Sequence, residues 1–440
     1  MVTASHNPAA YNGYKVYWEN GAQLSAPHDV EIAGTIARDA SVLALPRLTR
    51  PAARAAGLWQ SLTGLEDSYL RGLAARLGAP PSPRLTPSVA YTALHGVGEP
   101  LARAALQLAG VTAIESVLEQ AEPDPDFPSV RFPNPEEPGT TERVLALAER
   151  TGATLALAND PDADRLAAMA RTNDGTLAAL SGNELGLLLC DYLLQQAPRD
   201  GRNLIVTTLV STPLAAAVAR DHAARLEVTL TGFKWIVGRA LELERAGFRF
   251  VLGFEEAIGY CIGDLVRDKD GIAAAAHVAR MSEWYAARSV DQTSAAASPP
   301  PSLHAALEAL YRKHGLIESS QVSLAVPPSA AALDQLQRRL QQLRTQPLTQ
   351  LAGLTVSARR DLLDAEARAQ PDWPPTDMLC FELEDRHRVT IRPSGTEPKI
   401  KVYIDCAARL STQDSLGAVR DQLAEVATQI ADDLRQRLGF

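Results

Sequence analysis

The sequence is poor in the features that mark several large classes of protein. It has only four cysteines, spread from Cys190 to Cys406 without a CxxC pair, which excludes a compact disulfide framework or a zinc site recognisable by its spacing. Its 43 lysines and arginines are outnumbered by 52 acidic residues, for a net charge of −9, so a nucleic-acid surface is not expected. No apolar run reaches the roughly 18 residues of a membrane helix, and no signal peptide is expected before the first polar motif. These absences favour a cytoplasmic protein that acts on a small molecule, with neither a nucleic acid nor a membrane as its partner.

The apolar residues that are present follow a regular alternation. With 440 residues, of which 46% are hydrophobic, the chain is too long for one core and should form three or four domains. Apolar strands alternate twice with amphipathic helices, which predicts a multidomain α/β protein of three-layer α/β domains with mostly parallel sheets. Ligands of such sheets bind where strands end. The expected strands are 84–94, 111–118, 153–160, 202–210, 226–231 and 248–256, and the expected helices are 98–110, 140–152, 211–223 and 232–247.

The last part of the chain has a different pattern, which predicts a small C-terminal α+β domain. Its closing helix has apolar residues at steps of three and four from Leu416 to Leu438, and Ser411 with Asp414 indicates a capping box at its start. The stretch 289–302, rich in serine, alanine and proline, is interpreted as a flexible surface insertion. The other expected elements are a polar helix near 329–343 and short strands at 378–385, 387–395 and 399–406.

The strongest local signal is the stretch ANDPDADRLA, which follows an expected buried strand. Asp160, Asp162 and Asp164 alternate, so an extended loop would point their carboxylates to one side, where they would repel one another without a cation. Oxygen ligands of this kind favour Mg²⁺ or Ca²⁺ over zinc, and the glycine and distal glutamate of an EF-hand are missing. An acidic turn without metal is the alternative. Arg165 follows directly, placed either for a phosphate or for a structural salt bridge.

The stretch TIRPSGTEPKIKVY combines groups that suit a phosphate dianion. Arg392 offers a guanidinium fork, Ser394 and Thr396 offer hydroxyls, and Gly395 permits a tight turn with exposed backbone N–H groups. An ordinary hairpin turn between two strands explains the same residues equally well.

Three further loops follow expected strands and carry charged residues. GFEEAIGY supplies Glu255 and Glu256, whose carboxylates suit sugar hydroxyls, although a solvated Glu-Glu pair is the plainer interpretation. TLTGFKWI supplies Lys234 and RDKDG supplies Lys269, each of which alone is typical of a surface lysine. The HGVG stretch at 95–98 lacks the rest of a nucleotide-binding fingerprint and is interpreted as a structural turn.

The opening stretch MVTASHNPAAYNGYKVYW places Ser5 in a dense polar turn. Asn7 and Pro8 force the chain to turn after His6, and Lys15 follows ten residues after Ser5. A serine hydroxyl is a weak nucleophile unless a base activates it or it already carries a phosphoryl group. From these residues alone, a frayed N-terminal turn is the alternative.

Taken together, the motifs TASHNP with YNGYK, DPDADR, GFEEAIGY and RPSGTEPK resemble the α-D-phosphohexomutase superfamily, that is, the phosphoglucomutase/phosphomannomutase family. The resemblance covers nearly the whole chain, and the combination of motifs in this order is specific. It implies a four-domain, heart-shaped enzyme with one loop from each domain lining a central cleft. The implied domains are 1–80 (phosphoserine loop), 81–178 (metal loop), 179–315 (sugar loop) and 316–440 (phosphate loop).

The resemblance also implies a role for each motif residue. Ser5 would be the phosphoserine and, through its phosphate, would hold Mg²⁺ together with Asp160, Asp162 and Asp164. Lys15 would transfer the proton of the sugar hydroxyl, with His6 supporting the loop. A sugar bisphosphate such as glucose 1,6-bisphosphate would be the intermediate and activator. The implied substrate-binding residues are Arg165, Thr231, Gly232, Lys234, Glu255, Glu256, Lys269, Arg392, Ser394, Gly395 and Thr396.

Two departures from the family pattern bear on substrate and activity. Where the hexose-specific members have a serine in the sugar loop, this chain has Ile258, and Tyr260 stands where many have histidine, which resembles the phosphopentomutase and glucose-1,6-bisphosphate synthase branch. Members carry roughly a hundred or more residues before the serine loop, so 1–80 is expected to be a truncated remnant of domain 1. The leading hypothesis is an isomerase that moves a phosphoryl group between positions 1 and 6 (or 5) of an aldose phosphate. The alternatives are phosphopentomutase or bisphosphate synthase activity, a phosphatase, and an impaired remnant that binds only Mg²⁺ and phosphosugar; a monomer or a dimer is expected.

Overall fold

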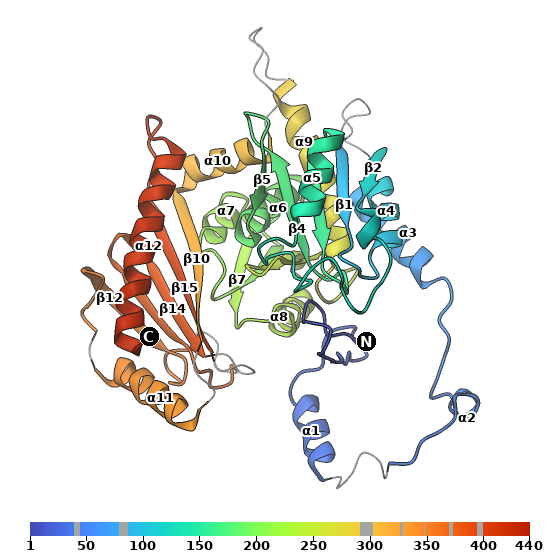
Figure 1. Cartoon of the computed structure of the whole chain (residues 1–440), viewed down its shortest axis with the longest axis horizontal. Coiled ribbons are helices and arrows are strands. Elements are labelled where there is room, and N and C mark those ends of the chain that lie inside the picture. The colour runs from blue at the N-terminus through green and yellow to red at the C-terminus, as the bar shows by residue number, and fades with distance from the viewer. Residues whose placement is uncertain are drawn as a thin grey trace. The chain divides into compact units, whose positions relative to one another are not determined.

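The computed structural model describes residues 1–38, 45–78, 87–290, 302–325, 329–346, 348–368, 373–393 and 399–440. These residues form two compact units. The first unit joins Met1–Thr208 to His222–Ala305, and the second joins Leu209–Asp221 to Ala306–Phe440. Figure 1 follows the chain from its N-terminus to its C-terminus through the labelled elements. Within the described ranges, none of the helices is long and apolar enough to cross a membrane.

The first unit contains a five-stranded sheet in the order β2-β1-β3-β4-β5. β1 lies between β2 and β3 and is parallel to both, whereas β4 and β5 are antiparallel to their neighbours. All five residues of the central strand β3 are buried, and α5 covers this sheet with Val144 and Leu147 against Ala156 and Met169. The elements are β1 (Ser88–Thr92), α4 (Glu99–Leu108), β2 (Ala113–Ser116), η2 (Leu118–Gln120), α5 (Glu142–Thr151), β3 (Leu155–Asn159), β4 (Leu166–Arg171) and β5 (Leu177–Leu180).

A second sheet in the same unit has four strands in the order β7-β6-β8-β9. β6 pairs in parallel with β7 and β8, and β9 returns antiparallel to β8. The six residues of β6 are all buried, and α8 packs Ile236 and Val237 against Leu204 and Phe250. The elements are α6 (Gly182–Gln196), β6 (Asn203–Thr208), β7 (Arg225–Thr229), α8 (Phe233–Arg245), β8 (Arg249–Glu255), β9 (Gly259–Ile262) and α9 (Gly271–Val290).

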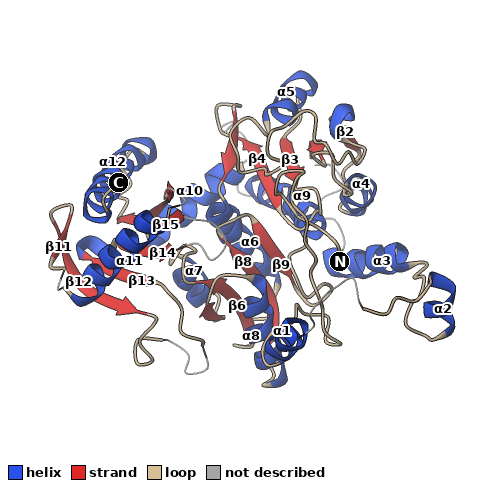
Figure 2. Cartoon of the chain, turned by 60° about the horizontal axis from the view of Figure 1, so that its bottom comes forward, coloured by secondary structure: helices blue, strands red, loops and turns tan. Residues whose placement is uncertain are grey.

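The second unit is built on a six-stranded antiparallel sheet in the order β10-β15-β14-β13-β12-β11. Figure 2 shows its strands in red and its helices in blue. The long helix α12 buries Leu423, Ile430 and Leu434. The elements are α7 (Ala215–Asp221), α10 (Leu303–His314, which enters from the first unit), β10 (Leu316–Ala325), α11 (Ala330–Thr345), β11 (Gln350–Leu351), β12 (Leu354–Asp361), β13 (Leu379–Leu383), η3 (Glu384–Arg386), β14 (Arg388–Pro393), β15 (Lys399–Ala408) and α12 (Leu416–Leu438).

The described residues before β1 form three helices and two isolated bridges rather than a sheet. The bridges join Val2 to Tyr14 and Tyr17 to Gln23. α3 contacts the residues after β9 in the same unit, since Nε of Arg76 donates to Asp264 at 3.0 Å and the hydroxyl of Tyr69 donates to Asp270 at 2.9 Å. The helices are α1 (His28–Arg38), α2 (Arg50–Ala55) and α3 (Leu65–Leu77).

The structure confirms the α/β class and the C-terminal α+β pattern and corrects several details. The two sheets of the first unit are mixed, because β4, β5 and β9 add antiparallel edges that the strand-helix alternation did not predict. The closing helix is capped by the hydroxyl of Ser415, which accepts from the Ala418 N–H group. Ser411 and Asp414 form a separate turn before it, so the predicted capping box was wrong. Most of the insertion expected at 289–302 lies outside the described residues, and the four-domain division stays a prediction.

Candidate active site

The three aspartates of the acidic loop lie together where β3 ends. One carboxylate oxygen from each of Asp160, Asp162 and Asp164 lies within 4.8 Å of the other two. Asp160 is fully buried, and Asp164 is only 6% exposed. Because burial and the charges of Asp164 and Asp162 both disfavour a further carboxylate, the pKa of Asp160 is raised to about 8. This concentration of buried negative charge needs positive charge close by.

The loop is held in place from the neighbouring strand. Gly96 lies so close to Pro161 that a Cβ atom there would stand 2.3 Å from the Pro161 Cα atom. The next residue, Val97, donates its N–H group to the Pro161 carbonyl at 3.0 Å. The buried hydroxyl of Tyr91 donates to the side chain of Asn159 at 2.7 Å. The stretch 95–98 is therefore the structural turn that its sequence predicted, and it supports the aspartates.

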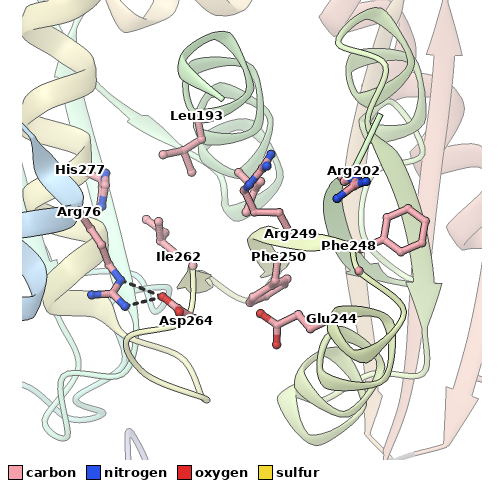
Figure 3. A pocket seen from close by; sticks show the side chains of 13 residues that line it. Arg76, Leu193, Arg202, Glu244, Phe248, Arg249, Phe250, Ile262, Asp264 and His277 are labelled. Atoms are coloured by element: carbon pink, nitrogen blue, oxygen red, sulfur yellow. Dashed lines mark hydrogen bonds and ion pairs between the residues drawn. The ribbon is translucent and has the colours of Figure 1, made fainter. Parts of the chain in front are cut away.

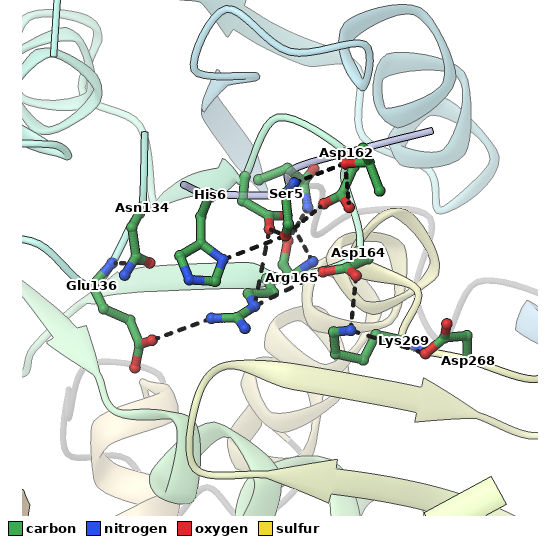
Figure 4. Close-up of polar contacts among 12 residues, drawn as sticks. Ser5, His6, Asn134, Glu136, Asp162, Asp164, Arg165, Asp268 and Lys269 are labelled. Carbon is green, nitrogen blue, oxygen red and sulfur yellow. Dashed lines mark hydrogen bonds and ion pairs between the residues drawn. The ribbon is translucent and has the colours of Figure 1, made fainter. Parts of the chain in front are cut away.

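Ser5 lies directly on this cluster (Figure 4). Its Oγ atom is 2.9 Å from Oδ2 of Asp160 and 3.1 Å from Oδ1 of Asp162, and Nδ1 of His6 is 3.3 Å away. Ser5 has a φ of 51°, in the left-handed region that residues with a Cβ atom rarely adopt. Burial and the charge of Arg165 lower the pKa of His6 to about 4, so this imidazole is neutral near pH 7. The polar turn at the start of the sequence thus belongs to a site.

Two lysines supply positive charge to the same carboxylates. Nζ of Lys15 lies 2.6 Å from Asp164 and 3.2 Å from Asp162, and Nζ of Lys269 lies 2.7 Å from Asp164. Although burial opposes it, these ammonium groups hold the pKa of Asp164 below its usual range. Burial likewise opposes the charged form of Lys15, but Asp164 and Asp162 outweigh it and raise the Lys15 pKa.

Arg165 lies between acidic groups from two loops. Its guanidinium is 3.6 Å from Glu136 and 3.9 Å from both Asp160 and Asp164, and its Nε atom is buried without a hydrogen-bond partner among the described residues. Although burial lowers it, the charges of Asp160 and Asp164 raise the pKa of Arg165. Figure 4 shows the guanidinium between Glu136 and the aspartates.

The donor set fits a hard divalent cation. Oδ1 of Asp164 is buried and has no hydrogen-bond partner among the described residues, which leaves it available as a ligand. A spread of 4.8 Å among the carboxylate oxygens is close to what metal–oxygen bonds of about 2.0–2.6 Å require. The ligands are all oxygens, as Mg²⁺ and Ca²⁺ prefer, and the second oxygens of Asp162 and Asp164 are held by lysine ammonium groups.

The loop after β8 joins the acidic loop through the backbone. Leu166 donates its N–H group to the Ile258 carbonyl at 3.0 Å, and Arg165 forms a bridge with Gly259. A Cβ atom on Gly182 would lie 2.0 Å from the Glu256 carbonyl oxygen. The start of α6 therefore packs directly against the backbone of the loop after β8. The acidic loop and the loop after β8 therefore form one connected cluster in the first unit.

The two glutamates of this loop have different surroundings. Glu255 accepts from the Gly232 N–H group at 3.3 Å, and burial raises its pKa despite the charges of Lys269 and Arg165. Oε2 of Glu256 accepts from the Thr208 hydroxyl at 3.4 Å.

The loop after β7 and the first turn of α8 carry three further predicted residues. The ammonium group of Lys234 lies over the Trp235 ring, 5.2 Å from its centroid, and Thr231 directly precedes Gly232. Gly232 itself has a φ of 110°, which glycine tolerates.

The expected phosphate loop is only partly within the described residues. Arg392 lies on β14, in the second unit, opposite Lys401 of β15. Ser394, Gly395 and Thr396 lie outside the described residues. The roles of these four residues stay predictions.

Several residues of the cluster were missed by the sequence analysis. Thr3 donates to Asp162 at 3.0 Å, Tyr17 donates to Asp268 at 2.6 Å, and Glu136 pairs with Arg165. Thr3 stands inside TASHNP, one of the motifs that carry the family resemblance, and this was the available signal, whereas Glu136 lies outside those motifs. Nothing in the sequence marks Tyr17, because its partner is 251 residues away.

Among the cavities lined by described residues of the first unit, two concern the site and its surroundings. One of about 330 Å³ adjoins the cluster and is lined by Lys15, Tyr17, Asp162, Asp164 and Lys269 among others. A second, of about 510 Å³, lies where β8 begins and is lined by Arg76, Phe250 and His277 among others (Figure 3). Of the candidate catalytic residues, Lys15 lines the first of these cavities.

The sequence matches three domain profiles of one family. They are described as phosphoglucomutase/phosphomannomutase alpha/beta/alpha domain I, over residues 1–42, domain II, over 67–175, and domain III, over 181–298. The domain I match does not itself reveal a truncation, so the expected loss of N-terminal residues stays a prediction.

Curated relatives match over most of the chain. A probable phosphoribomutase of Schizosaccharomyces pombe is 34% identical, covering 94% of this chain and 71% of that protein. Human phosphopentomutase is 33% identical over 99% and 72%, and a probable phosphomannomutase of Haemophilus influenzae is 34% identical over 93% and 77%. A human glucose 1,6-bisphosphate synthase is 31% identical over 99% and 71%.

Solved structures agree on the fold. The putative phosphomannomutase from Thermus thermophilus has a TM-score of 0.67 at 19% identity and covers 100% of this chain and 78% of that one. The matches define the chain as an enzyme of the phosphomutase class, which are isomerases. More specifically, it belongs to the phosphoglucomutase/phosphomannomutase family.

Proposed function

We propose that this chain moves a phosphoryl group between position 1 and position 6 (or 5) of an aldose phosphate, through a phosphoserine at Ser5 and a sugar bisphosphate. One observation carries the proposal: Oγ of Ser5 lies 2.9 Å from Asp160 and 3.1 Å from Asp162. Ser5 also has a φ of 51°, an uncommon conformation that surrounding contacts must hold and that is often found at active sites, which supports a hydroxyl held in place over these carboxylates.

The proposed reaction returns one phosphoryl group to Ser5 for each one that leaves it, so no phosphate is consumed. In the first half-reaction the bond between phosphorus and Oγ of Ser5 breaks, and phosphorus bonds to a sugar hydroxyl oxygen, whose proton passes to a base. The bisphosphorylated sugar turns around in the site. Its other phosphoryl group then returns to Ser5, and the product hydroxyl regains a proton. Most of the rate enhancement comes from positioning and charge stabilisation.

Asp160, Asp162 and Asp164 would hold Mg²⁺, together with a phosphate oxygen on Ser5. When bound, the cation supplies charge that stabilises the transferring phosphoryl group. Oδ1 of Asp164 has no hydrogen-bond partner among the described residues, which supports its role as a ligand. Lys15 and Lys269 keep the remaining oxygens of Asp162 and Asp164 paired, which fixes the orientation of the two carboxylates.

Lys15 is the proposed acid and base for the sugar hydroxyl. Its ammonium group lies on the aspartates beside Ser5 and keeps its proton, because Asp164 and Asp162 raise its pKa. Neutralising those carboxylates would lower that pKa toward the range needed for proton exchange. His6, which is neutral and within 3.3 Å of Oγ, supports the loop.

Substrate recognition is assigned to the remaining loops. Glu256, with Glu255 beside it, would accept hydrogen bonds from sugar hydroxyls. Arg165 would contact the phosphoryl group during transfer, because its guanidinium lies beside Asp160 and Asp164. Thr231, Gly232, Lys234 and Lys269, with Arg392, Ser394, Gly395 and Thr396, would bind the phosphate that does not react.

The substrate is proposed to be a pentose phosphate, or a hexose phosphate that needs no hydrogen bond from the side chain at position 258. The side chain of Ile258 is only 4% exposed and has no hydroxyl, so it offers no hydrogen bond to a hexose. Relatives named phosphoribomutase and phosphopentomutase support a pentose, and the relative named phosphomannomutase keeps a hexose open.

One assay tests the proposal. The protein is supplied with Mg²⁺ and catalytic glucose 1,6-bisphosphate, and with the 1-phosphates of ribose, deoxyribose, glucose and mannose in turn. Interconversion of 1- and 5- or 6-phosphates that is lost in Ser5→Ala is expected. Ser25→Ala, a serine outside the cluster, is the matched control and should retain activity. Full activity of Ser5→Ala would refute the mechanism.

The same assay separates the alternatives. Net accumulation of sugar bisphosphate from a phosphoryl donor would indicate a bisphosphate synthase, as one relative is named. Steady release of inorganic phosphate would indicate a phosphatase. Binding of Mg²⁺ and phosphosugar without turnover would indicate an impaired protein. The four-domain division, the cytoplasmic location and the choice between monomer and dimer stay predictions.

A further inference from the structure

Ser5 has a backbone conformation that its surroundings must maintain. A φ of 51° is unfavourable for a residue with a Cβ atom and persists only where other contacts determine it. The backbone of Ser5 is held by Thr3, because the N–H group of Ser5 donates to Oγ1 of Thr3 at 2.8 Å. Thr3 therefore fixes the turn that presents the serine hydroxyl to the aspartates.

Thr3 is itself rigidly placed. Its N–H group donates to the Gly13 carbonyl at 2.9 Å, and a Cβ atom on residue 13 would stand 2.8 Å from the Thr3 carbonyl oxygen. Next to this contact, Lys15 donates its N–H group to the Met1 carbonyl at 2.8 Å. The short antiparallel contact of residues 1–3 with 13–15 thus places Thr3 and Lys15 together.

The hydroxyl of Thr3 also reaches the acidic loop. While its oxygen accepts from Ser5, its proton is donated to Oδ2 of Asp162 at 3.0 Å. Lys15 holds the same oxygen at 3.2 Å. As a result Oδ1 of Asp162 is turned toward Ser5, 3.1 Å from Oγ. One hydroxyl group therefore orients both the serine and an aspartate of the proposed metal site.

We propose that Thr3 is a positioning residue, which couples the conformation of Ser5 to the orientation of the Asp162 carboxylate. The Ser5 part of this inference rests on the proposed function; the Asp162 part requires only that the acidic loop binds a cation. The role needs a group that accepts one hydrogen bond and donates another at the same time. A hydroxyl group can do this and a methyl group cannot. Partners of a ligating carboxylate typically change metal affinity by 10- to 100-fold when removed.

The test compares Thr3→Val, which keeps the shape and loses the hydroxyl, with Thr3→Ser, which keeps the hydroxyl. Mg²⁺ affinity of the unphosphorylated protein, measured by titration calorimetry, is expected to fall about 10-fold or more in Thr3→Val. It should stay within about threefold of the wild type in Thr3→Ser. Thr35→Val is the matched control, because the Thr35 hydroxyl donates to the Glu31 carbonyl and accepts from Arg38, both within the exposed helix α1.

A second readout follows Ser5 directly. Mass spectrometry measures the rate at which glucose 1,6-bisphosphate phosphorylates Ser5; this rate should fall about 10- to 100-fold in Thr3→Val and recover in Thr3→Ser. In steady state the loss should appear in kcat, with KM for the sugar phosphate within about twofold. Thr3→Ala serves as a second variant lacking the hydroxyl should Thr3→Val fold poorly in a thermal melt.

The outcomes are distinct. Wild-type Mg²⁺ affinity and phosphorylation in Thr3→Val or Thr3→Ala overturn the inference, as does equal loss in Thr3→Ser. If the wild-type protein binds Mg²⁺ but is never phosphorylated, the proposed function fails, and the calorimetric comparison still decides the effect of Thr3 on Asp162.

Discussion

Gly96 supports Pro161 through a contact that leaves no room for a side chain. A Cβ atom on residue 96 would lie 2.3 Å from the Cα atom and 2.4 Å from the carbonyl oxygen of Pro161, which stands between Asp160 and Asp162. The turn after β1 therefore sets the position of the acidic loop, which follows the neighbouring strand β3.

Gly96→Ala should displace the acidic loop, because neither of the two backbones can move without breaking the hydrogen bond between Val97 and Pro161. Overpacking of this kind costs about 1–3 kcal/mol, and we expect a lower melting temperature together with weaker Mg²⁺ binding. Gly34→Ala is the matched control, since no atom lies within 4 Å of its added Cβ atom. Unchanged Mg²⁺ affinity in Gly96→Ala would show that the contact does not position the aspartates.

Asp164→Asn removes the charge that both site lysines share. Nζ of Lys15 and Nζ of Lys269 lie 2.6 Å and 2.7 Å from the same carboxylate, so the substitution should leave two partly buried ammonium groups undercompensated. We expect Mg²⁺ affinity to fall at least about tenfold, measured by titration calorimetry. Asp174→Asn, in the turn between β4 and β5, is the control. Equal affinities of the two variants would remove Asp164 from the metal site.

Lys15→Met keeps the length of the side chain and removes its proton. If Lys15 transfers the proton of the sugar hydroxyl, kcat should fall by about 10²–10⁴, the usual effect of losing a general acid or base, while KM changes little. Steady-state kinetics with the best sugar phosphate measures both. Lys313→Met, a lysine with a 63% exposed side chain, should behave as the wild type. A loss confined to KM would instead assign Lys15 to substrate binding.

His277 makes the stability of the first unit depend on pH. It is only 5% exposed, and burial together with the charge of Arg280 lowers its pKa to about 4. Arg76 and Asp264 line the same cavity from α3 and from the residues after β9. Between pH 6.5 and 4 the unfolded chain binds a proton that the folded chain refuses, so stability falls as pH is lowered through this range.

The contribution of His277 to this loss should approach about 3 kcal/mol near pH 4. Urea unfolding followed by tryptophan fluorescence, at pH 7 and at pH 4.5, measures it; Trp284 on the same helix is a suitable reporter. His277→Gln should lose less stability on acidification than the wild type, whereas His28→Gln, on the exposed helix α1, should match it. A wild-type pH dependence in His277→Gln would mean that His277 titrates normally.

Much of the site was predictable because its residues stand in short local motifs. The alternation of Asp160, Asp162 and Asp164 after an apolar strand indicated a common orientation, and the structure gathers them as expected. The helices α4, α5 and α8 and the strands they join followed from apolar periodicity and from glycines at their ends. These features depend on neighbours in sequence.

The remaining features depend on contacts between distant residues. The strands β4 and β5 are rich in alanine and β9 has only four residues, so their propensity is weak and pairing with a neighbouring strand decides them. Thr3 and Asp162 are 159 residues apart, and Tyr17 and Asp268 are 251 apart. No periodicity can reveal such pairs. Ser411 satisfied a local capping pattern, yet Ser415 caps the helix because the helix begins one turn later.

The central claim is that Ser5 carries and returns a phosphoryl group. The most direct test incubates the protein with Mg²⁺ and glucose 1,6-bisphosphate and measures its intact mass and the peptide that contains Ser5. We predict a gain of one phosphoryl group on Ser5, which disappears when sugar monophosphate is added and is absent in Ser5→Ala. A wild-type protein that interconverts sugar phosphates while Ser5 never carries a phosphoryl group would contradict the account.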